Sequence, residues 1–363
     1  METGLADFDV VEQLGHGSFG SVYKVKSKKD HRIYVWKEID YGRMSEKEKQ
    51  LIVTEVNILK DLENKNIVKY FNRYIDKNKR KLYILMECCE GGDLGKFIQS
   101  IKKTSGKIEE ATVLKIFSEV CCALKECHTR KSGKVIHRDL KPGNIFLDKD
   151  LNVKLGDFGL ARILSDQSKF AHTRLGTPYY MPPELLSDQL SDQGYDESCD
   201  IWSLGCILYE LCTLEPPFKA PNAVLLEKKI AAGKFNPIPS CYSKEVSELI
   251  NRMICVDPKK RISIVEICET SIVRFNIFDT YIKQRYKILK EKEKALEKRE
   301  QFIKKKEEKL EEKEKQLEKE RLAFLKEKTE FEKQKQTKSV DMTSGLSPLT
   351  ELNKENIYQT FKI

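Results

Sequence analysis

His137-Arg138-Asp139-Leu140-Lys141-Pro142-Gly143-Asn144 places a carboxylate, an ammonium group and a carboxamide within one short loop. Asp139 is positioned to accept a hydrogen bond from a hydroxyl group and to orient it for in-line attack. Lys141 can neutralise charge on a transferring phosphoryl group, and Asn144 offers an amide oxygen to a hard cation. Phosphoryl transfer requires positioning and charge neutralisation from a protein, and these three side chains supply both.

A second carboxylate follows at a fixed spacing. Asp157-Phe158-Gly159 comes thirteen residues after Asn144. Together, Asn144 and Asp157 are predicted to hold magnesium against the phosphates of a nucleotide. The chance that both motifs occur in this order and spacing by accident is negligible.

A glycine cluster lies near the N-terminus, in Gly15-His16-Gly17-Ser18-Phe19-Gly20-Ser21-Val22. Glycine lets backbone N–H groups approach phosphate oxygens without obstruction by side chains. The same spacing occurs in dinucleotide-binding folds, where it opens a helix. Here the flanking residues read as strands on both sides, which favours a β-hairpin lid over ATP.

A lysine and a glutamate complete the set of predicted catalytic residues. Lys37 ends a predicted strand fifteen residues after Val22, from where it can reach the α- and β-phosphates. It needs a carboxylate to hold it extended. Glu55, on the predicted helix that follows, is the natural partner.

Composition narrows the class of protein. The chain has 363 residues, which allows two or three domains. All eleven cysteines precede residue 270 without zinc-type CxxC spacing, so we expect a reducing compartment. The acidic start lacks a signal-peptide core, and no apolar run is long enough to cross a membrane.

Two segments precede a charged tail. Residues 8–90 read as strands with one helix at 46–63; the expected strands are 8–14, 21–27, 32–39, 67–75 and 82–87. Residues 91–273 read as mainly helical, with long apolar-periodic stretches at 111–128 and 200–212. Glycine and proline between these two stretches indicate an ordered but irregular region.

The tail carries a narrow apolar stripe. Apolar residues recur every seven positions from Ile282 to Phe331, which predicts a coiled coil over 281–336. The second core position is mostly charged, so the alternative is a solitary Glu/Lys-rich helix held by i,i+4 pairs. Residues 337–363 are polar and are predicted to be disordered. From Arg274 on, the chain holds 24 Lys+Arg and 18 Asp+Glu, so most of the net charge of +9 lies there.

Residues 8–271 resemble the eukaryotic protein kinases, motif by motif. The resemblance implies an α+β, bilobal fold with a small β-rich N-lobe, a large helical C-lobe and MgATP between them. It also implies that Glu184 pairs with Arg261 and that Asp200 braces the catalytic loop. Lys141, with Gly176-Thr177-Pro178, is typical of the serine/threonine class.

The same resemblance implies an adenine site. Met86 would be the gatekeeper, and backbone groups of Glu87 and Cys89 would bind the adenine ring. Further residues implied at the nucleotide are Leu14, Val22 and Val35 above the ring, Phe146 below it and Asp93 near the ribose. Cys89 is either a reactive thiol or an ordinary hinge residue. Kinases usually have alanine at the position of Val35, and the larger valine slightly narrows the adenine site above the ring.

Within the kinases the chain resembles the NIMA-related family and its centrosomal type, through Val35-Trp36-Lys37-Glu38-Ile39-Asp40-Tyr41-Gly42 and Leu124-Lys125-Glu126-Cys127-His128. This implies a cytoplasmic protein with centrosomal and nuclear roles in the cell cycle. Lys354-Glu355-Asn356 resembles a degron read by the mitotic ubiquitin ligase. Thr173 is the predicted main phosphorylation site, with Ser168 second and Thr177 as a further candidate, through autophosphorylation in a homodimer.

Two other classes were weighed against an active kinase acting on protein substrates. A pseudokinase scaffold would lack reacting groups, but Lys37, Glu55, Asp139, Asn144 and Asp157 are all present. A nucleic-acid or membrane binder would need a basic patch. In the tail, lysines alternate with glutamates and aromatic interleaving is missing, so neither ligand is expected.

Overall fold

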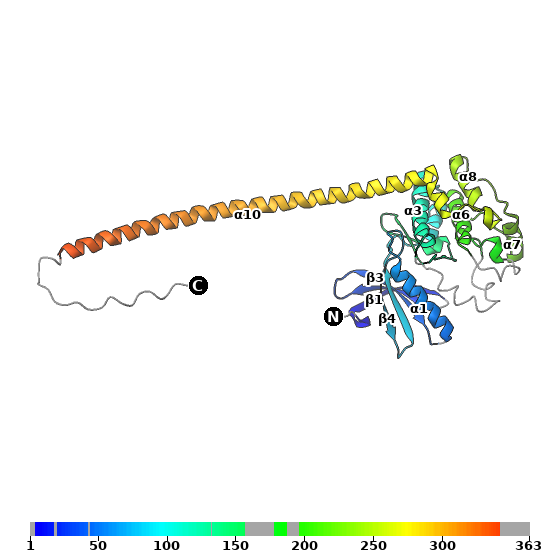
Figure 1. Ribbon diagram of the computed structural model, residues 1–363, viewed down its shortest axis with the longest axis horizontal. Coiled ribbons are helices and arrows are strands. Elements are labelled where there is room, and N and C mark those ends of the chain that lie inside the picture. Colours follow the sequence, from blue (N-terminus) through cyan, green and yellow to red (C-terminus); the bar gives the residue numbers. More distant parts are fainter. Residues whose placement is uncertain are drawn as a thin grey trace. The chain divides into compact units, whose positions relative to one another are not determined.

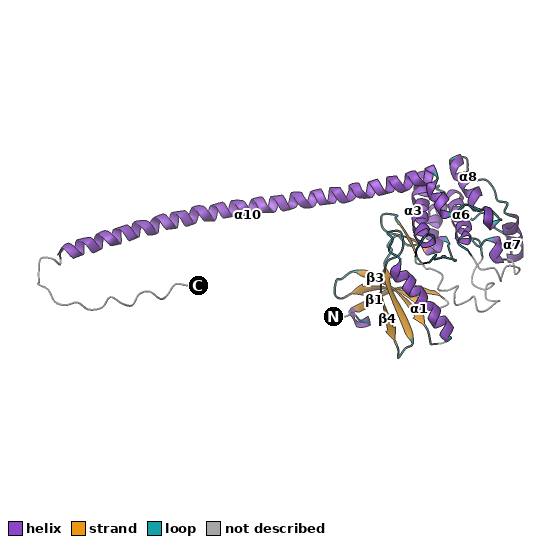
Figure 2. Cartoon of the chain, viewed as in Figure 1, coloured by secondary structure: helices purple, strands orange, loops and turns teal. Residues whose placement is uncertain are grey.

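The computed structural model describes residues 4–17, 20–42, 44–131, 133–156, 178–186 and 196–341. The chain divides into two compact units, residues 1–283 and 284–363. In the first unit the described strands come early and helices predominate later, as Figures 1 and 2 show. The predicted α+β class is therefore confirmed.

The N-terminal part is a five-stranded antiparallel sheet with one helix, α1 (Glu46–Asp61). The strands lie in the spatial order β1-β2-β3-β5-β4, with bounds β1 (Phe8–Gly17), β2 (Gly20–Ser27), β3 (Ile33–Asp40), β4 (Tyr70–Asp76) and β5 (Lys81–Glu87). A short 3₁₀ turn, η1 (Leu5–Asp7), precedes them. Ser45 caps α1 in a reciprocal pair with Glu48, which explains why the helix starts there.

Alternation along β5 gives the sheet two apolar faces. Leu82 and Ile84 pack with Ile52 and Val56 of α1. The intervening residues Tyr83 and Leu85 join a second cluster on the opposite face, together with Phe8, Val25 and Trp36. Since successive side chains of a strand point to opposite faces, this one strand contributes to both clusters.

β4 begins at Tyr70, three residues later than the apolar pattern predicted. Ile67 instead forms an isolated parallel bridge with Leu155, and the Val68 amide donates to the Leu155 carbonyl at 2.9 Å. The apolar run is continuous in sequence, but its first residues pair with the helical lobe. The sheet and the C-terminal lobe are thus joined through backbone hydrogen bonds.

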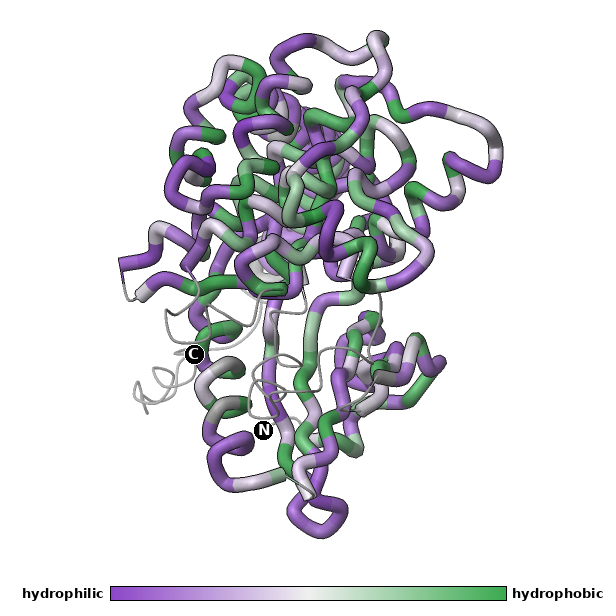
Figure 3. Tube along the Cα trace, turned by 90° about the vertical axis from the view of Figure 1, so that its right-hand side faces the viewer, coloured by the Kyte–Doolittle hydropathy of each residue, from purple (hydrophilic) through white to green (hydrophobic). Residues whose placement is uncertain are grey.

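Among its described residues, the C-terminal lobe is helical apart from one hairpin, formed by β6 (Ile145–Leu147) and β7 (Val153–Leu155). Its helices are α2 (Leu94–Lys103), α3 (Glu110–His128), α5 (Pro183–Leu186), α6 (Ser198–Thr213), α7 (Ala223–Ala232), α8 (Lys244–Met253) and α9 (Ile264–Glu269), with 3₁₀ turns η2 (Pro142–Asn144) and η5 (Pro258–Lys260). In Figure 3 many hydrophobic residues lie in the interior of this lobe.

Helix α6 forms the centre of the lobe. Every residue from Cys199 to Cys212 is buried. Trp202 stacks on Phe218 with the ring centroids 5.6 Å apart. A helix buried on all sides is mostly apolar all round, and its buried polar residues Asp200, Ser203 and Glu210 require hydrogen-bond partners.

Helix α10 (Ser271–Asp341) begins in the first unit and continues into the second. A helix over the tail is confirmed, and it runs past Gln336 to Asp341. Its stripe residues are exposed; Leu289, Leu317 and Phe324 each keep more than 60% of their surface accessible. Pairing with a second helix stays a prediction. Among the described residues, none of the helices is apolar over the length that a bilayer requires.

Close packing of α6 against α8 predicts the effect of a larger side chain at Gly205. A Cβ there would lie 2.8 Å from Met253 Cβ and 2.9 Å from Ile254 Cγ1. We expect Gly205→Val to lower the free energy of unfolding by about 1–3 kcal/mol, because it overpacks this contact. Denaturant titration measures the loss. Glu248→Val on the exposed side of α8 should cost less than about 0.7 kcal/mol; equal losses would contradict the packing argument.

Candidate active site

The catalytic loop brings together the three side chains that the sequence singled out. Lys141 Nζ donates to Asp139 Oδ2 at 2.7 Å. Asn144 Nδ2 donates to the same oxygen at 2.9 Å and to the Asp139 carbonyl at 2.7 Å. The Asp139 side chain remains 37% exposed, so a substrate hydroxyl can reach its carboxylate.

A buried carboxylate fixes the loop from behind. Asp200 Oδ2 accepts the His137 amide at 2.8 Å, and Oδ1 accepts the Arg138 amide at 2.9 Å. His128 Nε2 donates to Oδ2 at 2.8 Å. Arg138 has φ of +65°, a strained value for a residue with a side chain. The predicted brace is confirmed.

The environment keeps Asp200 ionised. Burial alone would raise the pKa of its carboxyl group, but the hydrogen bond and charge of His128 and the His137 amide outweigh burial. They hold the pKa below its ordinary value of 3.8. An ionised carboxylate accepts all three hydrogen bonds, which the protonated acid or an amide cannot do.

The glycine cluster forms the tip of a hairpin. Gly15 pairs with Val22, His16 with Ser21 and Gly17 with Gly20, so the hairpin interpretation is confirmed over the dinucleotide alternative. A Cβ at Gly20 would lie 1.7 Å from the carbonyl oxygen of Glu38, so only glycine fits there. Ser18 and Phe19 lie outside the described residues.

Lys37 lies on the face of the sheet that α1 covers. It is paired in register with Val22 on β2 and Ile84 on β5, and Ile84 packs against α1. Directly opposed residues of antiparallel strands share a face. The Lys37–Glu55 ion pair stays a prediction, because the side chain of Glu55 is outside the described set.

Four of the predicted adenine-binding residues lie in or beside the connection from β5 to α2, residues 87–92, which we call the hinge segment: Met86, Glu87, Cys89 and Asp93. Val35 is buried and lies opposite Met86 in the sheet. Phe146 on β6 bridges to Asp93. Leu14 on β1 is 48% exposed. Within the described residues, the Cys89 amide takes part in no backbone hydrogen bond, as a group that binds an adenine edge must.

Two hinge-region side chains are engaged within the chain. Asp93 caps α2 by accepting the Lys96 amide at 2.8 Å, and its other oxygen pairs with Lys96 Nζ at 3.2 Å. Its contact with ribose stays a prediction. Burial, followed by the nearby Glu87 carboxylate, raises the pKa of the Cys89 thiol to about 12. This favours the ordinary hinge residue over a reactive thiol.

Comparison with known proteins agrees with this geometry. The protein kinase domain family matches residues 8–273. The chain belongs to the protein kinase family. Serine/threonine-protein kinase Nek2 of Mus musculus is 50% identical over 275 residues, which make up 75% of this chain and 61% of that protein.

Two further relatives support the branch. Probable serine/threonine-protein kinase nek2 of Dictyostelium discoideum is 48% identical over 283 residues, 78% of this chain and 66% of the relative. G2-specific protein kinase nimA of Emericella nidulans is 40% identical over 291 residues, 74% of this chain and 41% of the relative. The kinase is therefore of the serine/threonine class and the NIMA-related branch. The matches span 41–66% of the length of these three relatives.

The loop of this kinase fits a magnesium ion at Asn144. Asn144 is 6% exposed, and its NH₂ group faces two acceptors on Asp139, so its Oδ1 is the atom left to face a cation. Amide and carboxylate oxygens are the ligands that magnesium prefers. The other predicted ligand, Asp157, lies outside the described residues, as do Ser168, Thr173 and Thr177.

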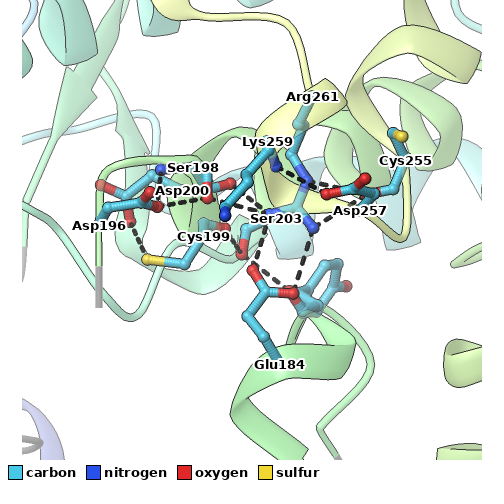
Figure 4. Close-up of polar contacts among 11 residues, drawn as sticks. Glu184, Asp196, Ser198, Cys199, Asp200, Ser203, Cys255, Asp257, Lys259 and Arg261 are labelled. Carbon is cyan, nitrogen blue, oxygen red and sulfur yellow. Dashed lines mark hydrogen bonds and ion pairs between the residues drawn. The ribbon is translucent and has the colours of Figure 1, made fainter. Parts of the chain in front are cut away.

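A second ion pair ties the C-lobe together, as Figure 4 shows. Arg261 Nη1 and Nη2 donate to the two carboxylate oxygens of Glu184 at 2.8 and 3.2 Å. The guanidinium group also lies over the Trp202 ring at 5.2 Å. The predicted Glu184–Arg261 pair is confirmed, and it anchors α5 to the core of the lobe.

Sequence reasoning missed a partly buried pair between Tyr180 and Glu210 of α6. The Tyr180 hydroxyl donates to Glu210 Oε2 at 2.6 Å, and the Tyr180 carbonyl accepts Ser203 Oγ at 2.8 Å. Burial raises the pKa of the Glu210 carboxyl group despite the Tyr180 hydrogen bond. A glutamate within the mostly apolar α6 was the signal available in the sequence, because buried carboxylates require partners.

Loss of the Asp200 carboxylate should disorder the catalytic loop. We expect Asp200→Asn to lower kcat at least tenfold and the free energy of unfolding by about 2–4 kcal/mol, because an amide leaves a buried backbone N–H unpaired. Steady-state kinetics and denaturant titration measure both. Asp196→Asn, near the exposed start of α6, is the control.

The pH dependence adds a sharper test of the same variant. Since the folded pKa of Asp200 is lowered, its stabilisation is present above 3.8 and is lost as pH falls further. The stability difference between wild type and Asp200→Asn should therefore shrink below that pH. A difference that stays constant from pH 7 to pH 3 would contradict the assignment.

Proposed function

We propose that this kinase transfers the γ-phosphoryl group of ATP to serine and threonine hydroxyls of proteins. The observation that carries the proposal is the loop in which Lys141 and Asn144 both contact the Asp139 carboxylate, held by Asp200. Each residue type meets one demand of in-line phosphoryl transfer.

In this mechanism, Asp139 accepts the hydrogen bond of the incoming hydroxyl and aims its oxygen at the phosphorus atom. Lys141, 45% exposed beside Asp139, places positive charge where the transferring phosphoryl oxygens pass. A bound magnesium ion would neutralise phosphate charge, and Asn144 would hold it through Oδ1. Lys37 is predicted to hold the α- and β-phosphates.

The nucleotide would lie between the glycine-rich hairpin and the C-lobe. The glycine-rich hairpin would offer its backbone N–H groups to the phosphates, because glycine leaves them unobstructed by side chains. The Cys89 amide would bind the adenine, and the Phe146 ring would support it from below. Orientation by these groups converts a bimolecular encounter into an in-line reaction.

A cell-cycle role completes the proposal. One relative is named a G2-specific protein kinase, and the resemblance to the centrosomal type suggests mitotic, centrosomal substrates. The Lys354-Glu355-Asn356 degron and its ubiquitin ligase stay predictions, because these residues are outside the described part. The scaffold alternative is favoured only by the long helix α10, and every predicted reacting residue argues against it.

Removal of the Asp139 carboxylate should abolish transfer but keep nucleotide binding. We expect Asp139→Asn to lower kcat by about 10²–10⁴-fold, because it removes the group that orients the hydroxyl. Peptide phosphorylation by the phosphorylated protein measures kcat, and calorimetry measures the Kd for ADP, which should change less than about threefold. Asp61→Asn, an exposed partner of Arg130, is the control. Retention of full activity by Asp139→Asn would refute the proposed mechanism.

The exposed stripe of α10 predicts a homodimer that accelerates activation. A truncated protein ending at Lys283 should sediment as a monomer, whereas the full chain should sediment as a dimer. At low protein concentration the truncation should slow autophosphorylation at the predicted sites Thr173 and Ser168 about tenfold or more. The reason is that dimerisation raises the effective concentration of one kinase for the other. Replacing Leu296, Leu310 and Leu317 by Ala should act like the truncation. Equal autophosphorylation rates in all forms would eliminate the dimer mechanism.

A further inference from the structure

The hinge segment is fastened at its far end to the β6–β7 hairpin. The Gly91 amide donates to the Leu147 carbonyl at 2.9 Å, and the Leu147 amide donates to the Gly92 carbonyl at 2.8 Å. A Cβ at Gly91 would lie 2.5 Å from the carbonyl oxygen of Asp148. This end of the hinge therefore lies directly against the C-lobe backbone.

The near end of the hinge is fastened to the same hairpin by an ion pair. Lys154 Nζ lies 2.8 Å from Glu87 Oε1 and 3.0 Å from Oε2. The Glu87 carboxylate also accepts the Lys69 amide at 3.2 Å, and the Glu87 amide donates to the Lys69 carbonyl at 2.9 Å. Glu87 thus connects the start of β4 in the N-lobe to β7 in the C-lobe.

The register of the hairpin relates this ion pair to the adenine site. Lys154 is directly opposite Phe146 in the β6–β7 pairing. Directly opposed residues of antiparallel strands place their side chains on one face, about 5 Å apart. Lys154 and Phe146 therefore lie on the same face of the β6–β7 hairpin. Lys154 contacts the hinge from this face, and Phe146 is predicted to lie beneath the adenine ring.

This ion pair differs from an ordinary surface pair. Exposed pairs contribute little, because water solvates both charges. Here the side chains of Lys154 and Glu87 are only 16% and 28% exposed, and one ammonium group contacts both carboxylate oxygens. Removal of Lys154 would leave a largely dehydrated carboxylate that must move to reach water, and the hinge backbone would move with it.

We propose that Lys154 is a positioning residue for nucleotide binding: its ion pair with Glu87 fixes the distance between the hinge backbone and the Phe146 ring. The inference rests on the proposed function in that the ligand is an adenine nucleotide. Lys154 touches no reacting atom, so it should affect nucleotide affinity and leave the chemical step nearly unchanged.

The experiment uses the full chain and ADP with magnesium as the probe, so that binding is measured without turnover. Lys154→Met should raise the Kd for ADP and the KM for ATP about three- to tenfold, with kcat within about twofold of wild type. Lys154→Arg should restore most of the affinity, because a guanidinium group also bridges two carboxylate oxygens. Lys149→Met, on the exposed turn of the same hairpin, should leave all three constants unchanged.

A double-mutant cycle separates positioning from simple loss of stability. Glu87→Gln and the Glu87→Gln/Lys154→Met double variant should bind ADP as weakly as Lys154→Met, within about twofold. Additive losses, or a lower thermal midpoint with unchanged Kd, would overturn the proposal. A higher kcat of these variants at an unchanged Kd for ADP would also overturn it, because the ion pair would then restrain motion of the hinge instead of positioning it. If wild type binds ADP but phosphorylates nothing, the proposed function fails, while the ADP affinities still decide the role of Lys154.

Discussion

The hydrogen bonds that the backbone of the catalytic loop donates to the Asp200 carboxylate are the constraint on which the active site depends. They hold Arg138 in a left-handed conformation that a residue with a side chain adopts only when its surroundings impose it. Asp139 is the next residue, so the strained backbone conformation of Arg138 determines the orientation of the Asp139 carboxylate. Asp200 lies on the buried helix α6 in the centre of the lobe. The packing of this helix holds Asp200 in place and so offsets the strain at Arg138.

The β6–β7 hairpin is the second element that organises the site. Glu119 of α3 accepts the Val153 amide at 2.7 Å, and Asn66 donates to the Val153 carbonyl at 3.1 Å. Leu155 pairs with the backbone of residues 66–68, and Lys154 pairs with Glu87. Successive residues of one short strand thus contact α3, the N-lobe and the hinge. Asn144, the predicted magnesium ligand among the described residues, directly precedes this hairpin.

Much of this arrangement was predictable because the chemistry lies in contiguous motifs. Asp139, Lys141 and Asn144 are neighbours in sequence, so a loop of any compact shape brings them close. The start of β4 was not predictable: Ile67 and Val68 are apolar and β-branched, and only the position of β7 decides that they leave the sheet. Lys154 and Glu87 are separated by 67 residues, and nothing in either local pattern indicates the partner. Pairs of that kind depend on strand register, which composition and periodicity leave undetermined.

The central claim is that the Asp139 loop of this kinase directs the γ-phosphoryl group to alcohol side chains. The most direct measurement is phosphorylation of a peptide library by the purified full chain with MgATP. The protein is first phosphorylated at the predicted sites Thr173 and Ser168, and mass spectrometry then locates the phosphate on the peptides. The account predicts phosphate esters on serine and threonine, formed one for one with ADP. A folded, ADP-binding protein that labels no peptide or protein, or that labels only tyrosine, would contradict it.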